Sequence, residues 1–156
     1  MPTLLGVAEH VTAVDLSPEM VKQAREALAA EAAAGRVDFA VASADRLPFP
    51  DKAFDTVVCH RLLHHLADPA ARAAVLREAA RVARRAVVAS FSDATTLKAR
   101  LQRLGGVKRR RTVLHPADFA AEAQRQGLTL DGAPIRLFGP LSLVAVAVLR
   151  VEGGAP

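Results

Sequence analysis

The amino-acid sequence predicts an α/β fold with a mostly parallel sheet, and three observations carry this prediction. Short apolar runs that suit buried strands alternate with segments whose apolar residues recur at the helical period. Helix-capping residues and glycines separate the two kinds of segment. Two apolar runs near the C-terminus follow one another without a helix between them, which predicts an antiparallel hairpin. This order is typical of a parallel sheet with helices on both faces, closed by antiparallel edge strands.

The expected strands are short and rich in Val and Ala. They occupy residues 11–14, 37–42, 56–59 and 86–91, followed by the terminal runs 128–135 and 141–151. The second, third and fourth of these runs contain almost no charge, so we expect them to be buried strands. Gly139 and Pro140 separate the two terminal runs and mark the turn of the hairpin.

The expected helices begin where a capping side chain precedes a proline, as at Ser17-Pro18 and Asp68-Pro69. The sequence predicts helices from Pro18 to the stop at Gly35, over residues 69–84, from the leucines that begin at Leu97 to residue 104, and over residues 116–126. The apolar positions expected on the inner face are Met20, Ala24, Ala27 and Leu28 in the first helix and Leu76, Ala79, Ala80 and Ala83 in the second. Residues 46–54 contain Pro48 and Pro50, which predict an ordered loop. Residues 61–67 are predicted to form a connector or a short helix.

Length and composition bound the class of protein. At 156 residues the chain fits one domain, residues 1–156, and is long enough to bury a core. The single cysteine, Cys59, excludes an intramolecular disulfide and fits a reducing compartment. The N-terminal residues lack the pattern of a signal peptide, and the longest apolar run, 141–149, is shorter than the ~20 residues of a membrane helix. We therefore expect a cytoplasmic protein that does not enter the membrane.

The net charge of +5 comes from one segment of the chain. Residues 98–111 hold seven Lys and Arg residues and no acid, and without them the rest of the chain would carry a net charge of −2. No aromatic residue interrupts this segment, so it lacks the stacking platform of a single-strand binder, which argues against nucleic acid as a partner. The plainer reading is a solvated helix face running into a loop, although the arginines could also attract an anionic substrate.

Candidate ligand-binding residues follow three of the expected strands: Asp15, the segment 43–45, and the pair Cys59 and His60. In open α/β sheets, ligands bind at the carboxyl ends of the strands. A carboxylate at Asp15 suits a vicinal diol, because it can accept two hydroxyl protons; alternatively it helps to cap the next helix. By itself Asp15 does not separate NAD from another adenosine cofactor.

Three longer stretches carry a family resemblance: VTAVDLSPEMVKQAREAL, VDFAVASADRLPFPDKAFDTVVCHRLLHHLADP and LREAARVARRAVVASF. Together they resemble the type 11 branch of the class I S-adenosylmethionine-dependent methyltransferases, similar to ubiquinone and menaquinone biosynthesis methyltransferases. The resemblance covers residues 11–91 and continues more weakly through TVLHPADFAAEAQRQGL. It implies a Rossmann-like three-layer sandwich, S-adenosylmethionine as cofactor, and methyl transfer to a small-molecule acceptor.

The resemblance also assigns roles to single residues. Asp15 would take the ribose hydroxyls and Leu16 would contact the adenine, while Ser43, Ala44 and Asp45 would lie beside the adenine ring. Ala44 would offer its backbone N–H. Ser43 stands where the family often has an acid, and Asp45 could substitute for it. In the same way, Cys59 and His60 would lie near the methionine end of the cofactor.

One part of the family pattern is missing. The family has a first strand and a GxGxG turn before the ribose-binding acid, whereas none of the nine glycines of this chain form a GxG pair. Residues 2–10 look like the tail of the helix that follows this turn, so we expect an N-terminally truncated form of the fold. The absent strand would lie in mid-sheet, between the strands ending at Asp15 and Cys59. The chain could be a fragment, a non-catalytic binding or scaffolding relative, or a protein that binds with half a site; an exposed sheet edge could also make it a homo-oligomer.

His60, His64 and His65 are the candidates for a general base, should the acceptor carry a proton, but no catalytic residue can be assigned. His60 and His64 would share one face if the connector were helical, which raises the question of a metal site with Cys59. The absence of a HExxH carboxylate and of a second cysteine argues against metal. An NAD-dependent oxidoreductase would share Asp15 but leaves the LPFPD and LHHL motifs unexplained.

Overall fold

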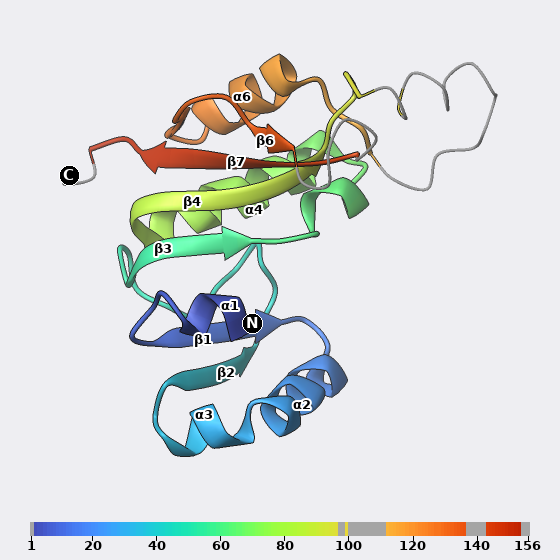
Figure 1. Ribbon diagram of the computed structural model, residues 1–156. Coiled ribbons are helices and arrows are strands. Elements are labelled where there is room, and N and C mark those ends of the chain that lie inside the picture. Colours follow the sequence, from blue (N-terminus) through green and yellow to red (C-terminus); the bar gives the residue numbers. More distant parts are fainter. Residues whose placement is uncertain (1, 97–98, 100–111, 137–142, 154–156) are drawn as a thin grey trace. The chain divides into compact units, whose positions relative to one another are not determined.

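The computed structural model describes residues 2–96, 99, 112–136 and 143–153 of the chain. The chain divides into two compact units, Met1–Pro48 and Phe49–Pro156, and each contains its own sheet (Figure 1). The expected helix from Leu97 to residue 104 and the basic segment 98–111 lie outside the described residues, apart from Ala99.

The first unit is a strand–helix–strand arrangement with a two-stranded parallel sheet. Its elements are α1 (Pro2–Leu5), β1 (Val11–Asp15), α2 (Pro18–Ala27), α3 (Ala29–Ala33) and β2 (Val37–Val41). The register pairs Val11 with Val37 and Asp15 with Val41, so both strands end at the same edge. Leu5, Leu28 and Val37 form the buried cluster between helices and strands. The strands expected at 11–14 and 37–42 are thus confirmed.

The first long helix differs from the expectation in two ways. Ser17 caps α2 as expected, because its Oγ accepts the N–H of Met20 at 3.4 Å. The helix is interrupted at Leu28, whose backbone leaves the helical region at φ −121° and ψ 31°, and α3 follows as a separate turn. The prediction that Met20 and Ala27 face the core was wrong: both are exposed.

The inner face of α2 is instead formed by Val21 and Ala24, and the buried Leu28 directly after the helix continues it. Because only two strands lie beneath α2, the helix buries a narrow stripe of its surface. Met20 lies outside this stripe, although it is next to the buried Val21 in the sequence.

The second unit contains a five-stranded mixed sheet. Its elements are β3 (Phe54–Cys59), η1 (Leu63–His65), α4 (Pro69–Val82), β4 (Ala83–Ser92), α6 (Pro116–Gln124), β5 (Leu128–Leu130), β6 (Ile135–Arg136) and β7 (Val144–Val151). The strand order is β3-β4-β7-β5, and β6 also pairs with β7. β3 and β4 are parallel, whereas β7 runs against β4, β5 and β6 (Figure 1). The antiparallel C-terminal pairing is confirmed, with its first arm divided into β5 and β6.

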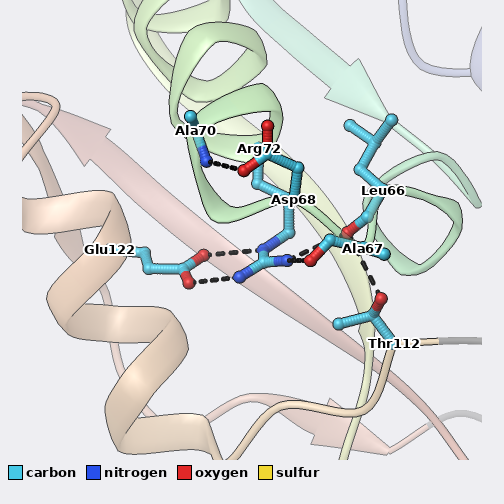
Figure 2. A network of polar contacts seen from close by, with 7 residues as sticks. All are labelled: Leu66, Ala67, Asp68, Ala70, Arg72, Thr112 and Glu122. Carbon is cyan, nitrogen blue, oxygen red and sulfur yellow. Dashed lines mark hydrogen bonds and ion pairs between the residues drawn. The ribbon is translucent and has the colours of Figure 1, made fainter.

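The boundary between α4 and β4 lies earlier than the expected end at residue 84. Asp68 caps the helix as expected, because its Oδ1 accepts the N–H of Ala70 at 2.9 Å (Figure 2). The helix ends at Val82, and the chain passes into β4 at Ala83 without a loop. Ala83 was expected on the helical face and is indeed fully buried, but in the strand.

The core of the second unit lies between one face of its sheet and the helices α4 and α6. Along β4, Val87, Ala89 and Phe91 are buried on the face that the helices cover, and the buried Ser90 and Ser92 show that the end of the strand is enclosed on its other face as well. Phe91 stacks on Phe119 of α6, with ring centroids 4.3 Å apart and planes 13° from parallel. This stack joins the sheet to α6 at the end of β4.

The expectation that the strands 37–42 and 56–59 are buried was wrong in part. Val41 is 51% exposed and Val58 is 42% exposed. Within the described residues, β1 and β2 pair only with each other and β3 pairs only with β4, so Val41 of β2 and Val58 of β3 both lie in edge strands, in different sheets. An edge strand has a neighbour on one side only, which leaves its alternate side chains less covered.

Among the described residues, no helix has both the length and the apolar character needed to cross a membrane.

Candidate functional site

Asp15 is the last residue of β1, and its side chain is exposed. Its Oδ1 accepts the backbone N–H of Ser17 at 2.8 Å, so the carboxylate is held at the start of α2. Its backbone carbonyl accepts the N–H of Ala42 at 3.1 Å, which joins the carboxyl ends of β1 and β2. Asp15 therefore helps to cap the start of α2, which was one of the two roles that the sequence suggested. Its fixed carboxylate is nevertheless exposed to solvent.

An apolar surface adjoins this carboxylate. Leu16 is 69% exposed directly after Asp15, and Met20 and Val41 are also exposed. Single exposed apolar side chains are common on protein surfaces, so what these residues offer is apolar area next to the Asp15 carboxylate that a ligand could cover.

The segment 43–45 forms a tight turn immediately after β2. Arg46 N–H donates to the carbonyl of Ser43 at 3.0 Å, which closes the turn. Ser43 and Ala44 are half-buried and Asp45 is exposed. Because Ala42 is hydrogen-bonded to Asp15, the structure brings together the five candidate residues of the first unit: Asp15, Leu16, Ser43, Ala44 and Asp45.

Cys59 and His60 lie in the second unit, at the carboxyl end of β3. Cys59 pairs with Ala89 of β4 and is buried, and burial raises the pKa of its thiol from the ordinary 9.0 to about 11. The thiol is therefore protonated at neutral pH and is a poor nucleophile. His60, the next residue, is exposed.

The connector between β3 and α4, residues 60–67, is non-helical except for one 3₁₀ turn, η1. His60 precedes this turn, so the idea that His60 and His64 share a helix face was wrong. His64 is buried and His65 exposed, and their ring centroids lie 4.2 Å apart. Of the three histidines considered as bases, His60 and His65 are thus the two that a substrate could reach. No group of three His, Cys, Asp or Glu residues suited to a metal lies within the part of the chain that the structure describes.

A polar network around Arg72 adjoins this segment and was not expected from the sequence (Figure 2). Arg72 lies in α4 and is only 3% exposed, and it donates two hydrogen bonds to Glu122 of α6. These hydrogen bonds raise the pKa of Arg72, while burial acts in the opposite direction. The partners are fifty residues apart, and no local pattern pairs them in the sequence.

A second unexpected group lies at the end of β4. The Asp93 carboxylate is buried and accepts hydrogen bonds from the N–H and Oγ1 of Thr95, both at 2.7 Å, and from Arg136 Nε at 3.1 Å. Burial works against ionisation of Asp93, but these hydrogen bonds and the charge of Arg136 lower its pKa below the ordinary value. Asp93 lies two residues after the predicted strand 86–91, which is the one sequence signal that could have identified it.

Comparisons with known proteins agree on one family. A family model described as a methyltransferase domain, type 11, matches residues 2–91. A ubiquinone biosynthesis O-methyltransferase from Xanthomonas euvesicatoria is 31% identical over 151 residues, which cover 88% of this chain and 61% of that protein. A ubiquinone/menaquinone biosynthesis C-methyltransferase from a Marinomonas species is 32% identical over 89 residues, which cover 57% of this chain and 36% of that protein.

Among solved structures, magnesium protoporphyrin IX methyltransferase from Synechocystis PCC 6803, with bound S-adenosylhomocysteine (SAH), superposes with a TM-score of 0.79 at 21% identity. The superposition covers 96% of this chain and 68% of that one. This likeness confirms the Rossmann-like α/β fold class expected from the sequence. The chain spans about three fifths of the length of the first of these curated relatives and about a third of the second.

Proposed function

Because this chain belongs to the type 11 methyltransferase domain family, we propose that it serves S-adenosylmethionine-dependent methyl transfer to a small-molecule acceptor. The observation that carries the proposal is the fixed, exposed carboxylate of Asp15 beside the exposed Leu16 and the turn at Ser43. The family match does not favour a non-catalytic scaffolding protein.

The residues of the first unit fit the adenosine part of the cofactor. Asp15 can accept the two ribose hydroxyls, because a carboxylate offers acceptor sites on both oxygens and only Oδ1 is engaged by Ser17 among the described residues. Leu16 offers an apolar surface for the adenine face. Ser43 and Asp45 can accept from the adenine amine, and Ala44 can donate its backbone N–H to a ring nitrogen.

For the methionine end of the cofactor, the family resemblance proposes Cys59 and His60. When bound, S-adenosylmethionine supplies a methyl group activated by a positively charged sulfur. The protonated thiol of Cys59 would not compete with the acceptor for that methyl group, since its pKa is raised to about 11. His60 and His65 are exposed and can remove a proton from an acceptor that carries one.

The test is a calorimetric titration of the chain with SAH, comparing the wild type with Asp15→Asn. Asparagine keeps an oxygen that can accept from Ser17 N–H but loses the charge that strengthens the hydrogen bonds to the ribose. We expect the Kd to rise about tenfold or more, as is usual when a hydrogen bond to a charged group is weakened.

The matched control is Asp38→Asn, which removes an exposed carboxylate from the neighbouring strand, where it pairs with His10 at 3.2 Å. This control should bind SAH like the wild type. An equal Kd for Asp15→Asn and the control would contradict the role of Asp15, and no binding by the folded wild-type chain would contradict the proposed function.

A further inference from the structure

The pair formed by Arg72 and Glu122 is the most enclosed ion pair in the described part of the chain. Its side chains are 4% and 12% exposed, whereas every other ion pair there has a partner that is at least 32% exposed. The contact is bidentate: Arg72 Nε donates to Glu122 Oε2 at 2.9 Å and Nη2 donates to Oε1 at 2.6 Å. This geometry fixes the plane of the guanidinium between α4 and α6.

The remaining terminal nitrogen of Arg72 binds the backbone that leads from β3 to α4. Nη1 donates to the carbonyl of Leu66 at 2.9 Å and to that of Ala67 at 3.1 Å (Figure 2). These are the two residues that follow η1. Arg72 therefore joins Glu122 on one side to the connector on the other.

The connector is held at further points. Thr112 N–H donates to the carbonyl of His64 at 2.8 Å. Thr112 Oγ1 donates to the carbonyl of Leu66 at 3.3 Å (Figure 2). At the opposite end, Arg61 N–H donates to Ser90 Oγ at 2.7 Å. Arg61 adopts φ 57°, a left-handed conformation that is unfavourable for a non-glycine residue. Such a conformation persists because the surrounding contacts hold it.

Stability alone is a weak reason for this arrangement. Burying a charged pair costs desolvation energy, and apolar residues of similar size often serve packing as well. What an apolar pair could not do is bind two consecutive carbonyls and so define the path of residues 60–67. That path determines where the imidazoles of His60 and His65 lie.

We propose that Arg72 and Glu122 are a positioning pair for the methyl-transfer site, acting through residues 60–67 on His60 and His65. This inference rests on the proposed function, in which His60 lies at the reacting end of the cofactor. Arg72 and Glu122 touch neither cofactor nor substrate in this proposal. Their effect is to hold the connector in one conformation.

The test compares Arg72→Lys and Glu122→Gln with the wild type. Lysine keeps the charge but lacks the planar fork, so it cannot bind Glu122 bidentately and also reach both carbonyls. Glutamine keeps the shape of Glu122 and removes its charge. The control is Arg84→Lys, which makes the same change in the exposed pair that Arg84 forms with Asp55.

Binding of SAH, binding of adenosine and the NMR signals of the imidazoles together distinguish a positioning role from a general loss of structure. We expect both variants to bind SAH roughly 3- to 30-fold more weakly, the range typical of residues that act at a distance. Adenosine, which lacks the methionine part, should bind the variants like the wild type. The NMR signals of the His60 and His65 imidazoles should shift, while those of His10 and His115 stay in place.

Three results would overturn the inference. The first is SAH binding by both variants that equals that of Arg84→Lys; the second is an equal weakening of SAH and adenosine. The third, no binding of either ligand by the folded wild-type chain, would overturn the proposed function and this inference with it. If Arg72→Lys does not fold, Thr112→Val tests the same segment, because it removes only the hydrogen bond from Thr112 Oγ1 to Leu66. Unchanged SAH binding together with unchanged imidazole signals in Thr112→Val would also contradict the inference.

Discussion

At the scale of single residues, Cys59 shows how burial decides reactivity. Its thiol is the chain's one cysteine, and its pKa is raised to about 11 by burial at the end of β3. Little thiolate therefore exists at neutral pH, and a thiol reagent can react only when the surrounding structure opens locally.

We predict that native Cys59 reacts with a disulfide reagent at pH 7.5 at least about 100-fold more slowly than the unfolded chain, because both access and ionisation are suppressed.

The unfolded thiol ionises near pH 9 and the folded thiol near pH 11, so the raised pKa favours the folded state up to pH 9 and that contribution is lost as the pH rises towards 11. Urea titrations between pH 8 and 11, with Cys59→Ala as control, measure this loss. Equal pH dependence of the two proteins would show that Cys59 is not the group responsible.

At the scale of elements, helix ends show which signals in the sequence are local. Ser17 and Asp68 each precede a proline and each caps its helix, as the sequence predicted. α6 begins differently: His115 is the capping residue, and its Nδ1 accepts the N–H of Ala117 at 3.2 Å. Histidine is a weaker cap than aspartate and loses its acceptor when it is protonated.

We predict that His115→Asp stabilises the protein by about 0.5–1 kcal/mol at pH 7, because aspartate caps better and its charge favours the helix N-terminus. His115→Ala should destabilise it by a similar amount, since the N–H of Ala117 loses its partner. Denaturant midpoints of the three proteins measure both effects. A gain from alanine would mean that the cap contributes nothing to stability.

At the scale of the whole molecule, the division into two sheets is the main feature of the chain. The first unit has only two paired strands, whereas β4 and β7 in the second unit each have strands on both sides. A two-stranded sheet is marginally stable by itself, so its stability depends on the helices that cover it. The two units should therefore open with different free energies.

Native-state hydrogen exchange tests this expectation. We predict that the amides of β1 and β2 exchange as one group, about tenfold or more faster than those of β4 and β7, because fewer strands protect them. The amides shared by β4 and β7 serve as the internal reference. One common exchange rate for all four strands would mean that the chain opens as a single cooperative unit.

The family match and the fold class could be predicted from the sequence because their signals are local. The alternation of apolar runs with capped helices predicted β1, β2, β4 and the closing pair formed with β7. The ends of the predicted strands suggested Asp15 and the segment 43–45 as candidate ligand residues. The same reasoning placed Met20 in the core and missed the break at Leu28. The first error arises because the width of the sheet under a helix, which no local pattern reveals, decides which of its apolar residues are covered. No residue pattern marks the break at Leu28, which lies inside a run of good helix formers.

What the sequence by itself determined is the order and type of the elements, the candidate residues that follow the strands, and the membership of the family. Only the tertiary structure decided that the strands form two sheets, that Cys59 is buried with a raised pKa while His60 is exposed, and that Arg72 meets Glu122 over the connector. The physical reason is the range of the interactions. Helix periods and caps act over a few residues, whereas sheet pairing, burial and ion pairs join residues that are dozens of positions apart.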